Sequence, residues 1–455
     1  MKAFHAYDIR GVYGTDFTGK DVYKIGFFLP KLLGIKKILV GRDARVSSPE
    51  IHKELLLGIC DSGSDVYDIG LSTTPQVYYA TVKYGFGASV QITASHNPAE
   101  YNGLKISREQ AMPVGYDSGL NLLEAWIGAA NPNAERPISP AAQSGKVIQF
   151  SVQDNYLDFL RGFLGDYSNL KIGFDLSNGM ASLFMRELLG DVPLYLYEEL
   201  DCSFPNHQPN PLLPENTKAL QALVVKERCD VGVIFDGDAD RVMFVDEGGN
   251  FISPDLMIAV LGHYFFEEKG LNGSVLQDIR TSKAVGEYLT PMGAEMHTWR
   301  VGRAFAALKL REINGIFGGE LAGHYYFKDF FYSDSGIMAA LIILNVISKM
   351  KAEGISVSQL INRIRRYHSS GEINYRIERK KEAMETVCDY FSAKEQPVAK
   401  YDFDGYRLEF PAWWFNIRPS NTEPYLRFIA EASTMELLQE KLAIVEQLLK
   451  KYKTT

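Results

Sequence analysis

Short apolar runs rich in β-branched residues alternate with longer amphipathic segments up to about residue 366. Five of these runs have the length and composition of buried strands: residues 37–41, 88–92, 170–175, 231–235 and 273–278. Helix signals lie between them. The cap Ser47 and the early Pro49 predict a helix that runs to about Asp61, and a second helix is expected over 182–189. Such alternation is typical of parallel α/β units.

The pattern changes after residues 367–371. Alternation of apolar and polar positions in 373–377 and 406–410 predicts antiparallel strands in a smaller α+β domain. We therefore expect four domains, at residues 1–148, 149–250, 251–366 and 367–455. Residues 131–137, rich in Pro and Asn, predict an exposed connection. No repetition among the first three domains is visible in the sequence.

Composition narrows the class of protein. A chain of 455 residues with 46% hydrophobic content can bury several cores. The net charge of −8 argues against a nucleic-acid partner but leaves anionic substrates open, because local cations set the field in a binding site. The longest apolar stretch, 337–347, is too short for a bilayer and predicts a core helix. With no signal peptide at the start, we expect a cytoplasmic protein without a membrane partner. The cysteines lack paired or metal-ligand spacing and are expected to be reduced and buried: Cys60, Cys202, Cys229 and Cys388.

Three carboxylates follow the apolar run 231–235 at alternate positions. Asp236, Asp238 and Asp240 would emerge at the carboxyl end of a strand, where Gly237 and the small Ala239 allow the backbone to curl them toward one point. Ligation by oxygen alone suits a hard divalent ion, above all Mg2+. The alternative interpretation is a solvated acidic turn.

A serine occupies the corresponding position after the run 88–92. Residues 93–98 read Thr-Ala-Ser-His-Asn-Pro, and Pro98 biases Asn97 away from helical geometry, which predicts an extended loop that presents Ser95. A serine is a weak nucleophile until it is activated. A polar turn with a helix cap is the alternative.

Six segments resemble motifs of one enzyme family. They occur in the family's order and resemble the α-D-phosphohexomutases, most of all the phosphomannomutase/phosphoglucomutase branch: residues 7–11, 93–98, 102–105, 236–241, 318–324 and 418–424. The resemblance implies three similar mixed α/β domains and a smaller C-terminal α+β domain around a central cleft. It implies an enzyme that interconverts hexose 1-phosphate and hexose 6-phosphate. The expected hexose is mannose, and glucose is left open. The reaction would pass through a phosphoserine and a hexose 1,6-bisphosphate, which also serves as activator.

The resemblance also implies roles for individual residues. Ser95 would carry the phosphoryl group, and Mg2+ would be held by an oxygen of that group on Ser95 and by Asp236, Asp238 and Asp240. Three further residues are expected in catalysis: Arg10, His96 and Lys105. The substrate would contact Tyr7, Arg241, Arg280, Arg303, Glu320, His324, Arg418, Ser420, Asn421, Thr422 and Arg427. The alternatives are surface ion pairs for the cations, a proline-bracketed turn for 418–422, and orientation of backbone for the histidines.

The sequence departs from the family pattern at two places. Ala322 stands where a serine is usual, so one polar contact to the sugar is absent or comes from another group. Arg300 and Arg303 stand where lysine and histidine are usual. Because arginine stays protonated near neutral pH, it cannot accept and release a proton during the reaction. Proton transfer must therefore use Lys105, His324 or another group.

Three other functions remain open. Phosphoglucosamine mutase is the nearest alternative. A sugar-phosphate phosphatase would release inorganic phosphate steadily, and a catalytically silent sugar-phosphate binder would never label Ser95. Two phosphate sites with different tasks favour a mutase, and we expect the last domain to close over the substrate and exclude water. The expected oligomeric state is a monomer or a weak homo-oligomer.

Overall fold

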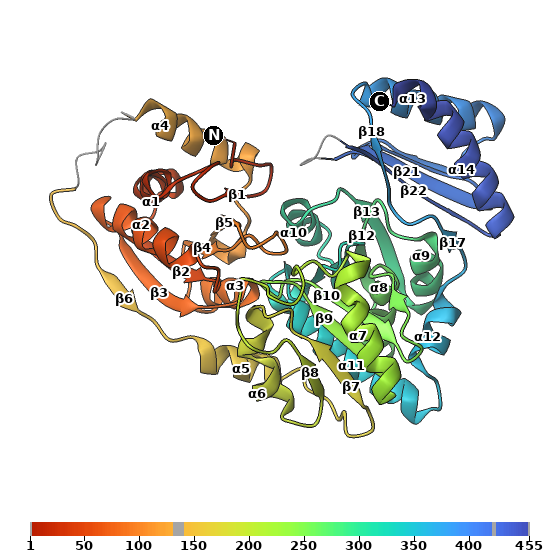
Figure 1. Ribbon diagram of the computed structural model, residues 1–455, viewed down its shortest axis with the longest axis horizontal. Helices are drawn as coiled ribbons and strands as arrows, with labels where there is room; N and C mark the ends of the chain where they lie inside the picture. Colours follow the sequence, from red (N-terminus) through yellow and green to blue (C-terminus); the bar gives the residue numbers. More distant parts are fainter. Residues whose placement is uncertain (1, 131–140, 421–424, 454–455) are drawn as a thin grey trace.

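The computed structural model describes residues 2–130, 141–420 and 425–453. The connection predicted at 131–137 and the predicted ligands Asn421 and Thr422 lie outside these ranges. Four sheets follow one another along the chain. Figure 1 shows the first at the left and the fourth at the upper right, with the second and third between them.

The first sheet has the strand order β1-β5-β4-β2-β3-β6. Its strands are β1 (Ile9–Val12), β2 (Lys37–Arg42), β3 (Asp65–Leu71), β4 (Ala88–Ile92), β5 (Tyr101–Arg108) and β6 (Val147–Gln149). The helices of this part are α1 (Gly19–Leu33), α2 (Ser48–Asp61), α3 (Thr74–Lys83) and α4 (Leu120–Ala129). Helices α1 and α2 pack closely through Gly26 and Gly58, where an added Cβ would lie 2.4 and 2.1 Å from a carbonyl oxygen of the opposite helix.

The second sheet has the order β11-β10-β9-β7-β8. Its strands are β7 (Ile172–Asp175), β8 (Leu194–Leu196), β9 (Val231–Phe235), β10 (Val242–Asp246) and β11 (Phe251–Ile252). Its helices are α5 (Gln153–Arg161), α6 (Met185–Leu189) and α7 (Pro214–Glu227). The single helix predicted over 182–189 is wrong. A 3-10 turn, η3 (Met180–Leu183), is separated from α6 at Phe184, whose backbone leaves helical geometry while its side chain is fully buried.

The third sheet has the order β13-β12-β14-β15-β16. Its strands are β12 (Gly273–Asp278), β13 (Ala294–Trp299), β14 (Phe317–Gly319), β15 (Tyr325–Phe327) and β16 (Ser333–Asp334). Its helices are α8 (Leu256–Gly262), the π-helix η4 (His263–Glu268), α9 (Lys283–Leu289), α10 (Arg303–Glu312), α11 (Gly336–Ala352) and α12 (Val357–Ile364). The apolar stretch 337–347 lies within the buried part of α11, as predicted. No helix in the described parts of the chain has the length and apolar character needed to cross a membrane.

The fourth sheet is antiparallel and has the order β17-β22-β21-β20-β19, with β18 also paired to β22. Its strands are β17 (His368–Ser369), β18 (Ile373–Arg376), β19 (Ala399–Tyr401), β20 (Tyr406–Glu409), β21 (Trp413–Pro419) and β22 (Tyr425–Ala432). Two helices cover it, α13 (Lys380–Lys394) and α14 (Met435–Leu449). Short 3-10 turns elsewhere are η1 (Glu109–Ala111), η2 (Tyr116–Ser118), η5 (Thr290–Met292), η6 (Lys328–Phe330) and η7 (Lys450–Tyr452).

The first three sheets repeat one topology. In each, four successive strands lie in the order fourth, third, first, second: β5-β4-β2-β3, β10-β9-β7-β8 and β15-β14-β12-β13. The third and fourth strands form an antiparallel hairpin, and the other pairs are parallel. The predicted fold class, three similar mixed α/β domains and a smaller α+β domain, is confirmed.

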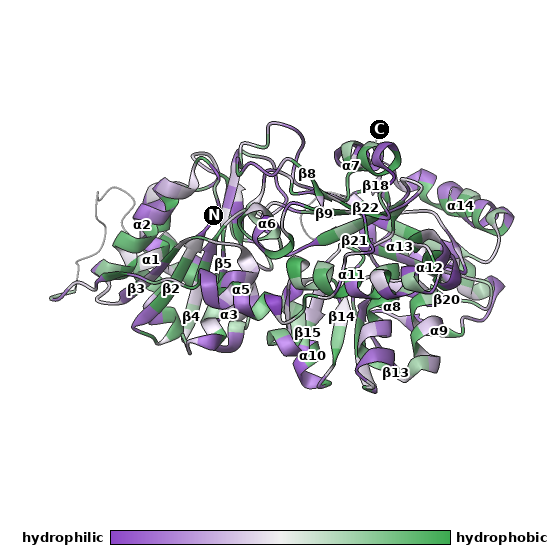
Figure 2. Ribbon diagram, turned by 90° about the horizontal axis from the view of Figure 1, so that it is seen from below, coloured by the Kyte–Doolittle hydropathy of each residue, from purple (hydrophilic) through white to green (hydrophobic). Residues whose placement is uncertain are grey.

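Apolar packing joins the first three domains. Helix α3 of the first sheet shares one hydrophobic core with α5, β9, α8 and α11, whereas the fourth domain has a separate core. Figure 2 shows the hydrophobic colour on central strands such as β2, β14 and β15 and a mixture on outer helices such as α2. The four cysteines are buried and free, as predicted.

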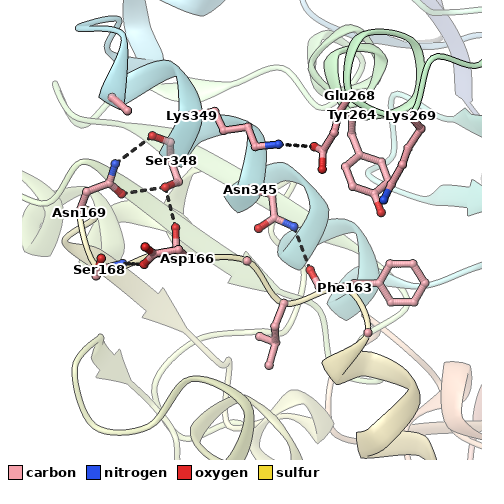
Figure 3. Close-up of a pocket in the computed structure, with 14 residues that line it drawn as sticks. Phe163, Asp166, Ser168, Asn169, Tyr264, Glu268, Lys269, Asn345, Ser348 and Lys349 are labelled. Atoms are coloured by element: carbon pink, nitrogen blue, oxygen red, sulfur yellow. Dashed lines mark hydrogen bonds and ion pairs between the residues drawn. The ribbon is translucent and has the colours of Figure 1, made fainter.

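A polar pocket marks the junction between residues 162–169 and α11 (Figure 3). Its volume is about 370 Å3, and its side chains hydrogen-bond to one another across the junction. Asn345 donates to the Phe163 carbonyl at 2.9 Å, and Asn169 donates to the Ser348 carbonyl at 2.9 Å. These bonds fix the connection between α5 and β7 of the second domain against a helix of the third.

Candidate active site

Equivalent hairpin loops carry the candidate residues of the first three domains. The β4–β5 loop carries Ser95, the β9–β10 loop carries the three aspartates, and the β14–β15 loop carries Glu320 and His324. The second and third loops join directly, because Arg241 and His324 form an antiparallel bridge. One repeated topology therefore supplies three walls of a single site.

Ser95 is 1% exposed and faces the acidic loop of the second domain. Its Oγ donates a hydrogen bond to Asp236 Oδ2 at 3.0 Å. The extended loop predicted here is wrong. Ser95 has a left-handed backbone with φ 53°, and the Asn97 N–H donates to the Ala94 carbonyl at 3.1 Å, which closes a turn. Pro98 restrains only its neighbour Asn97, whereas Ser95 is held from outside the loop.

The three aspartates are fully buried and form one cluster. A carboxylate oxygen of each lies within 4.8 Å of the others. Burial, together with the nearby Asp240 and Asp238, raises the pKa of Asp236 well above its usual value. Asp238 Oδ1 and Asp240 Oδ1 are buried without a hydrogen-bond partner among the described residues. Unsatisfied buried carboxylate oxygens are costly unless a cation is present, so this donor set fits a divalent metal ion.

Lys105 adds a fixed positive charge to the same cluster. Its Nζ lies 2.6 Å from Asp238 Oδ2 and 2.5 Å from Asp240 Oδ2. Burial lowers the pKa of Lys105, but these two carboxylates outweigh it and raise the pKa above its ordinary value. Lys105 is therefore a permanent cation at the site.

His96 and Arg10 lie on the Ser95 side. His96 Nδ1 is 3.4 Å from Ser95 Oγ. Burial, followed by the charges of Arg241 and Arg10, lowers the pKa of His96 well below its usual value and keeps the imidazole neutral. Arg10 donates to the Asn97 side chain at 2.7 Å and pairs with Asp8.

His324 is fixed through both ring nitrogens. Arg241 Nε donates to His324 Nε2 at 2.9 Å, so the ring proton resides on Nδ1, which lies 2.6 Å from Asp334 Oδ2. Asp334 also pairs with Arg303, whose Nε is 3.1 Å from Oδ1. Asp334 therefore holds Arg303 and His324 side by side. The guanidinium carbon of Arg303 lies 3.8 Å from the centre of the Tyr78 ring, on which the guanidinium stacks.

Glu320 is held by a residue of β15, the strand that follows its loop. The Tyr326 hydroxyl donates to Glu320 Oε1 at 2.6 Å, and Arg280 Nη2 lies 4.0 Å from Oε2. Burial raises the pKa of Glu320. Asp278 positions the group further, because it pairs with Arg280 at 2.7 Å and accepts the Leu321 N–H at 2.8 Å.

The fourth domain reaches these loops through two carboxylates. Asp404 pairs with Arg418 at 3.2 Å and accepts the Val301 N–H at 2.9 Å. The Val301 carbonyl in turn accepts a hydrogen bond from the Tyr7 hydroxyl at 3.3 Å.

Glu372 makes the other link. It lies 3.6 Å from Arg280 Nη1 and 3.2 Å from Arg427 Nη1. Ser420 lies at the end of the described segment, where its N–H donates to the Tyr425 carbonyl at 2.9 Å. The described substrate candidates of the fourth domain therefore connect to those of the first and third.

Sequence reasoning missed several side chains around the site. They are Arg45, Thr74, Asp334, Tyr326, Glu372 and Asp404. Thr74 is the first residue of α3, and its hydroxyl donates a hydrogen bond to Asp238 Oδ2, which ties the first domain to the metal cluster. The sequence around Thr74 does not indicate a contact with a residue so far along the chain. For Arg45 the sequence offers one indication: two charged residues, Asp43 and Arg45, stand between a predicted buried strand and a predicted helix.

Fold and site together define a class of protein, a four-domain α/β phosphotransferase. Four family profiles of phosphoglucomutase/phosphomannomutase match the chain: α/β/α domain I at residues 1–127, domain II at 154–249, domain III at 253–367 and the C-terminal domain at 372–447. The chain belongs to the phosphoglucomutase/phosphomannomutase family.

Individual proteins of this family are similar to the chain over nearly its full length. A phosphomannomutase of Escherichia coli is 34% identical over 446 residues, which is 95% of each chain. A phosphomannomutase of Vibrio cholerae is 34% identical over 469 residues, or 99% of each chain. The crystal structure of a family protein from Burkholderia thailandensis has a TM-score of 0.85 and 26% identity, and covers 99% of this chain and 97% of its own. The family and enzyme class predicted from the sequence are confirmed.

Proposed function

We propose that this chain is a phosphohexomutase that interconverts hexose 1-phosphates and hexose 6-phosphates through a phosphorylated Ser95. The hydrogen bond of 3.0 Å between Ser95 Oγ and Asp236 carries the proposal, because it joins a hydroxyl that can accept a phosphoryl group to a buried acidic cluster. The phosphomannomutases among the relatives support mannose phosphates as substrates, with glucose phosphates left open.

The four domains would divide the work. Residues 1–148 carry Ser95, 149–250 hold the metal, 251–366 recognise the sugar through Glu320, and 367–455 bind the unreacting phosphate through Arg418 and its neighbours. A carboxylate such as Glu320 can accept hydrogen bonds from two vicinal sugar hydroxyls. Asn421 and Thr422 keep their predicted part in the phosphate site.

We assign Mg2+ to the cluster of Asp236, Asp238 and Asp240 beside Ser95. The donors are all oxygens, which suits a hard cation, and two of them have no hydrogen-bond partner among the described residues. When bound, the ion would supply positive charge near the oxygens of the phosphoryl group. Lys105, Arg10 and Arg241 supply fixed positive charge from the protein, and phosphoryl transfer depends mainly on such positioning and charge.

The reaction balances as two transfers. The bond between Ser95 Oγ and phosphorus breaks while the free hydroxyl of a hexose monophosphate forms a bond to the same phosphorus. The hexose hydroxyl loses its proton to a base, and the Ser95 oxygen takes up a proton. The product is a hexose 1,6-bisphosphate. It reorients in the site and returns its other phosphoryl group to Ser95. Added hexose 1,6-bisphosphate would therefore activate an unphosphorylated enzyme.

We assign proton transfer at Ser95 to His96. The imidazole is neutral and lies 3.4 Å from the hydroxyl, whereas the aspartates hold Lys105 in its protonated form. His324 would orient Arg241, because both of its ring nitrogens are engaged. Arg303 would act as a fixed cation toward phosphate.

The test is phosphopeptide mapping after incubation with labelled glucose 1,6-bisphosphate and Mg2+. We expect label on Ser95 in the wild type and none in Ser95→Ala, together with a loss of mutase activity of about 1000-fold or more. Label that persists in Ser95→Ala would contradict the proposal. Steady release of inorganic phosphate would indicate a phosphatase, and ligand binding without any label would indicate a silent binder.

Assays on three hexose 1-phosphates, of mannose, glucose and glucosamine, identify the sugar. Rapid turnover of the amino sugar alone would favour a phosphoglucosamine mutase. The expected location in the cytoplasm and the expected monomer or weak homo-oligomer stay predictions.

A further inference from the structure

Arg45 lies in the loop between β2 and α2, 50 positions before Ser95, and its side chain is fully buried. Its guanidinium faces the Ser95 loop rather than solvent. Four carbonyl oxygens of that loop and of the first residue of β5 accept hydrogen bonds from it: those of Ser95 at 2.8 Å, Asn97 at 2.8 Å, Pro98 at 2.6 Å and Tyr101 at 3.0 Å.

Arg45 is itself held from two sides. Its Nε donates to Asp43 Oδ2 at 3.1 Å, and its backbone N–H donates to Asp43 Oδ1 at 3.1 Å. The guanidinium carbon lies 5.0 Å from the ring centre of Phe204, which belongs to the second domain. Arg45 therefore sits where the serine loop meets the domain that carries the aspartates.

The contacts use the whole donor capacity of the side chain. An arginine has five N–H donors in a planar fork, and here Nε serves Asp43 while Nη1 and Nη2 each serve two carbonyls. A lysine at this position has three donors and no fork, so it cannot reproduce the pattern.

The Ser95 backbone needs such support. Its φ of 53° lies in a backbone region that residues other than glycine rarely adopt, so surrounding contacts must maintain this conformation. The Ser95 carbonyl also meets the acidic loop, because a Cβ added to Gly237 would lie 2.5 Å from that oxygen. The contact that Arg45 makes with this carbonyl therefore sets how Ser95 meets Asp236.

We propose that Arg45 is a positioning residue for phosphoryl transfer: it fixes the Ser95 backbone so that Oγ faces the aspartates. The inference rests on the proposed function of Ser95 as phosphoryl carrier. Arg45 acts on the transfer step and not on sugar binding, since Glu320 and Arg418 belong to other domains. A small misplacement of a reacting group lowers a rate by about 100-fold.

The test compares Arg45→Lys with wild type and with Arg42→Lys. Arg42 is a matched control, because the only described hydrogen bond of its side chain is a long one of 3.4 Å to the Asp43 carbonyl. The measurements are the rate at which labelled glucose 1,6-bisphosphate phosphorylates Ser95, kcat and KM for mannose 1-phosphate, and the thermal midpoint. For Arg45→Lys we expect labelling and kcat to fall about 100-fold while KM stays within about threefold. Arg42→Lys should match wild type.

Asp43→Asn is the substitute variant if Arg45→Lys does not fold. The asparagine keeps the shape of the Asp43 side chain that holds Arg45 but removes its charge. We expect it to slow labelling about tenfold with KM unchanged. Labelling within about threefold of wild type, in Arg45→Lys or in its substitute, overturns the inference. A loss that only matches the fraction of unfolded protein also overturns it. A wild type that never labels Ser95 overturns the proposed function and this inference together.

Discussion

At the scale of the residue, Glu320 is oriented by a hydrogen bond from Tyr326. The Tyr326 hydroxyl is 2.6 Å from Glu320 Oε1, and hydrogen bonds to charged groups are worth about 1.5–3 kcal/mol. We expect Tyr326→Phe to raise KM for the sugar phosphate about tenfold or more. The hydrogen bond lowers the pKa of Glu320 against the effect of burial, so its loss should move the acidic limb of kcat/KM to higher pH.

Tyr325→Phe is the matched control for that prediction. The Tyr325 hydroxyl is also fully buried but donates to the Pro254 carbonyl at 2.8 Å, away from Glu320. This variant should lose about 1 kcal/mol of unfolding free energy and keep the wild-type KM and pH profile. Equal effects of the two variants on KM would show that Tyr326 acts through general stability alone.

At the scale of the element, the β4–β5 and β9–β10 loops approach as closely as backbone allows. Gly237 permits this approach, since an added Cβ would lie 2.5 Å from the Ser95 carbonyl oxygen. We expect Gly237→Ala to separate the loops, lower mutase kcat about 100-fold and reduce the unfolding free energy by about 1–3 kcal/mol. Gly128→Ala in α4 has open space around its Cβ and should raise stability by about 0.5–1 kcal/mol without loss of activity. Wild-type kcat in Gly237→Ala would contradict this account.

The same loops show what sequence can and cannot predict. The strands β4 and β9 match the predicted ranges 88–92 and 231–235, because short apolar runs between polar loops specify buried strands locally. The motif residues were located for the same reason, since they follow those strands directly.

The turn at Ser95 could not be predicted, because it is hydrogen-bonded by Arg45, which lies 50 positions earlier in the chain. Lys105 and Asp240, 135 positions apart, meet only once two sheets have packed together. Neither contact leaves a periodic signal in the chain.

At the scale of the whole molecule, the fourth domain differs from the rest. One hydrophobic core runs through the first three, whereas the fourth has its own and contacts the third through polar groups and the Trp299–Phe403 ring pair. Arg407 donates to the Ile279 and Thr281 carbonyls at 2.8 and 2.6 Å, on either side of Arg280. Polar interfaces between domains permit relative motion more readily than a common core. This division agrees with the expected closure over the substrate.

Glu431 makes that interface sensitive to pH. It accepts hydrogen bonds from Ser282 at 2.6 Å and Trp414 at 2.9 Å. Burial and the nearby Asp255, offset in part by Arg407, raise the pKa of Glu431 from 4.5 to about 7. Because the folded pKa is the higher one, the stabilising contribution is complete below about pH 4.5 and is lost as pH rises through 7. The loss amounts to about 3.5 kcal/mol at most, at roughly 1.4 kcal/mol per pKa unit.

Glu431→Gln should remove this dependence, because the amide keeps a hydrogen-bond acceptor and cannot ionise. We expect the urea midpoint of the wild type to fall between pH 5 and pH 8 more steeply than that of the variant, as followed by tryptophan fluorescence, to which Trp413 and Trp414 of the fourth domain contribute. Glu440→Gln, on the exposed side of α14, is the matched control and should retain the wild-type slope. Parallel slopes for wild type and Glu431→Gln would show that Glu431 is ionised in the folded protein at pH 5 and that the interface does not respond to it.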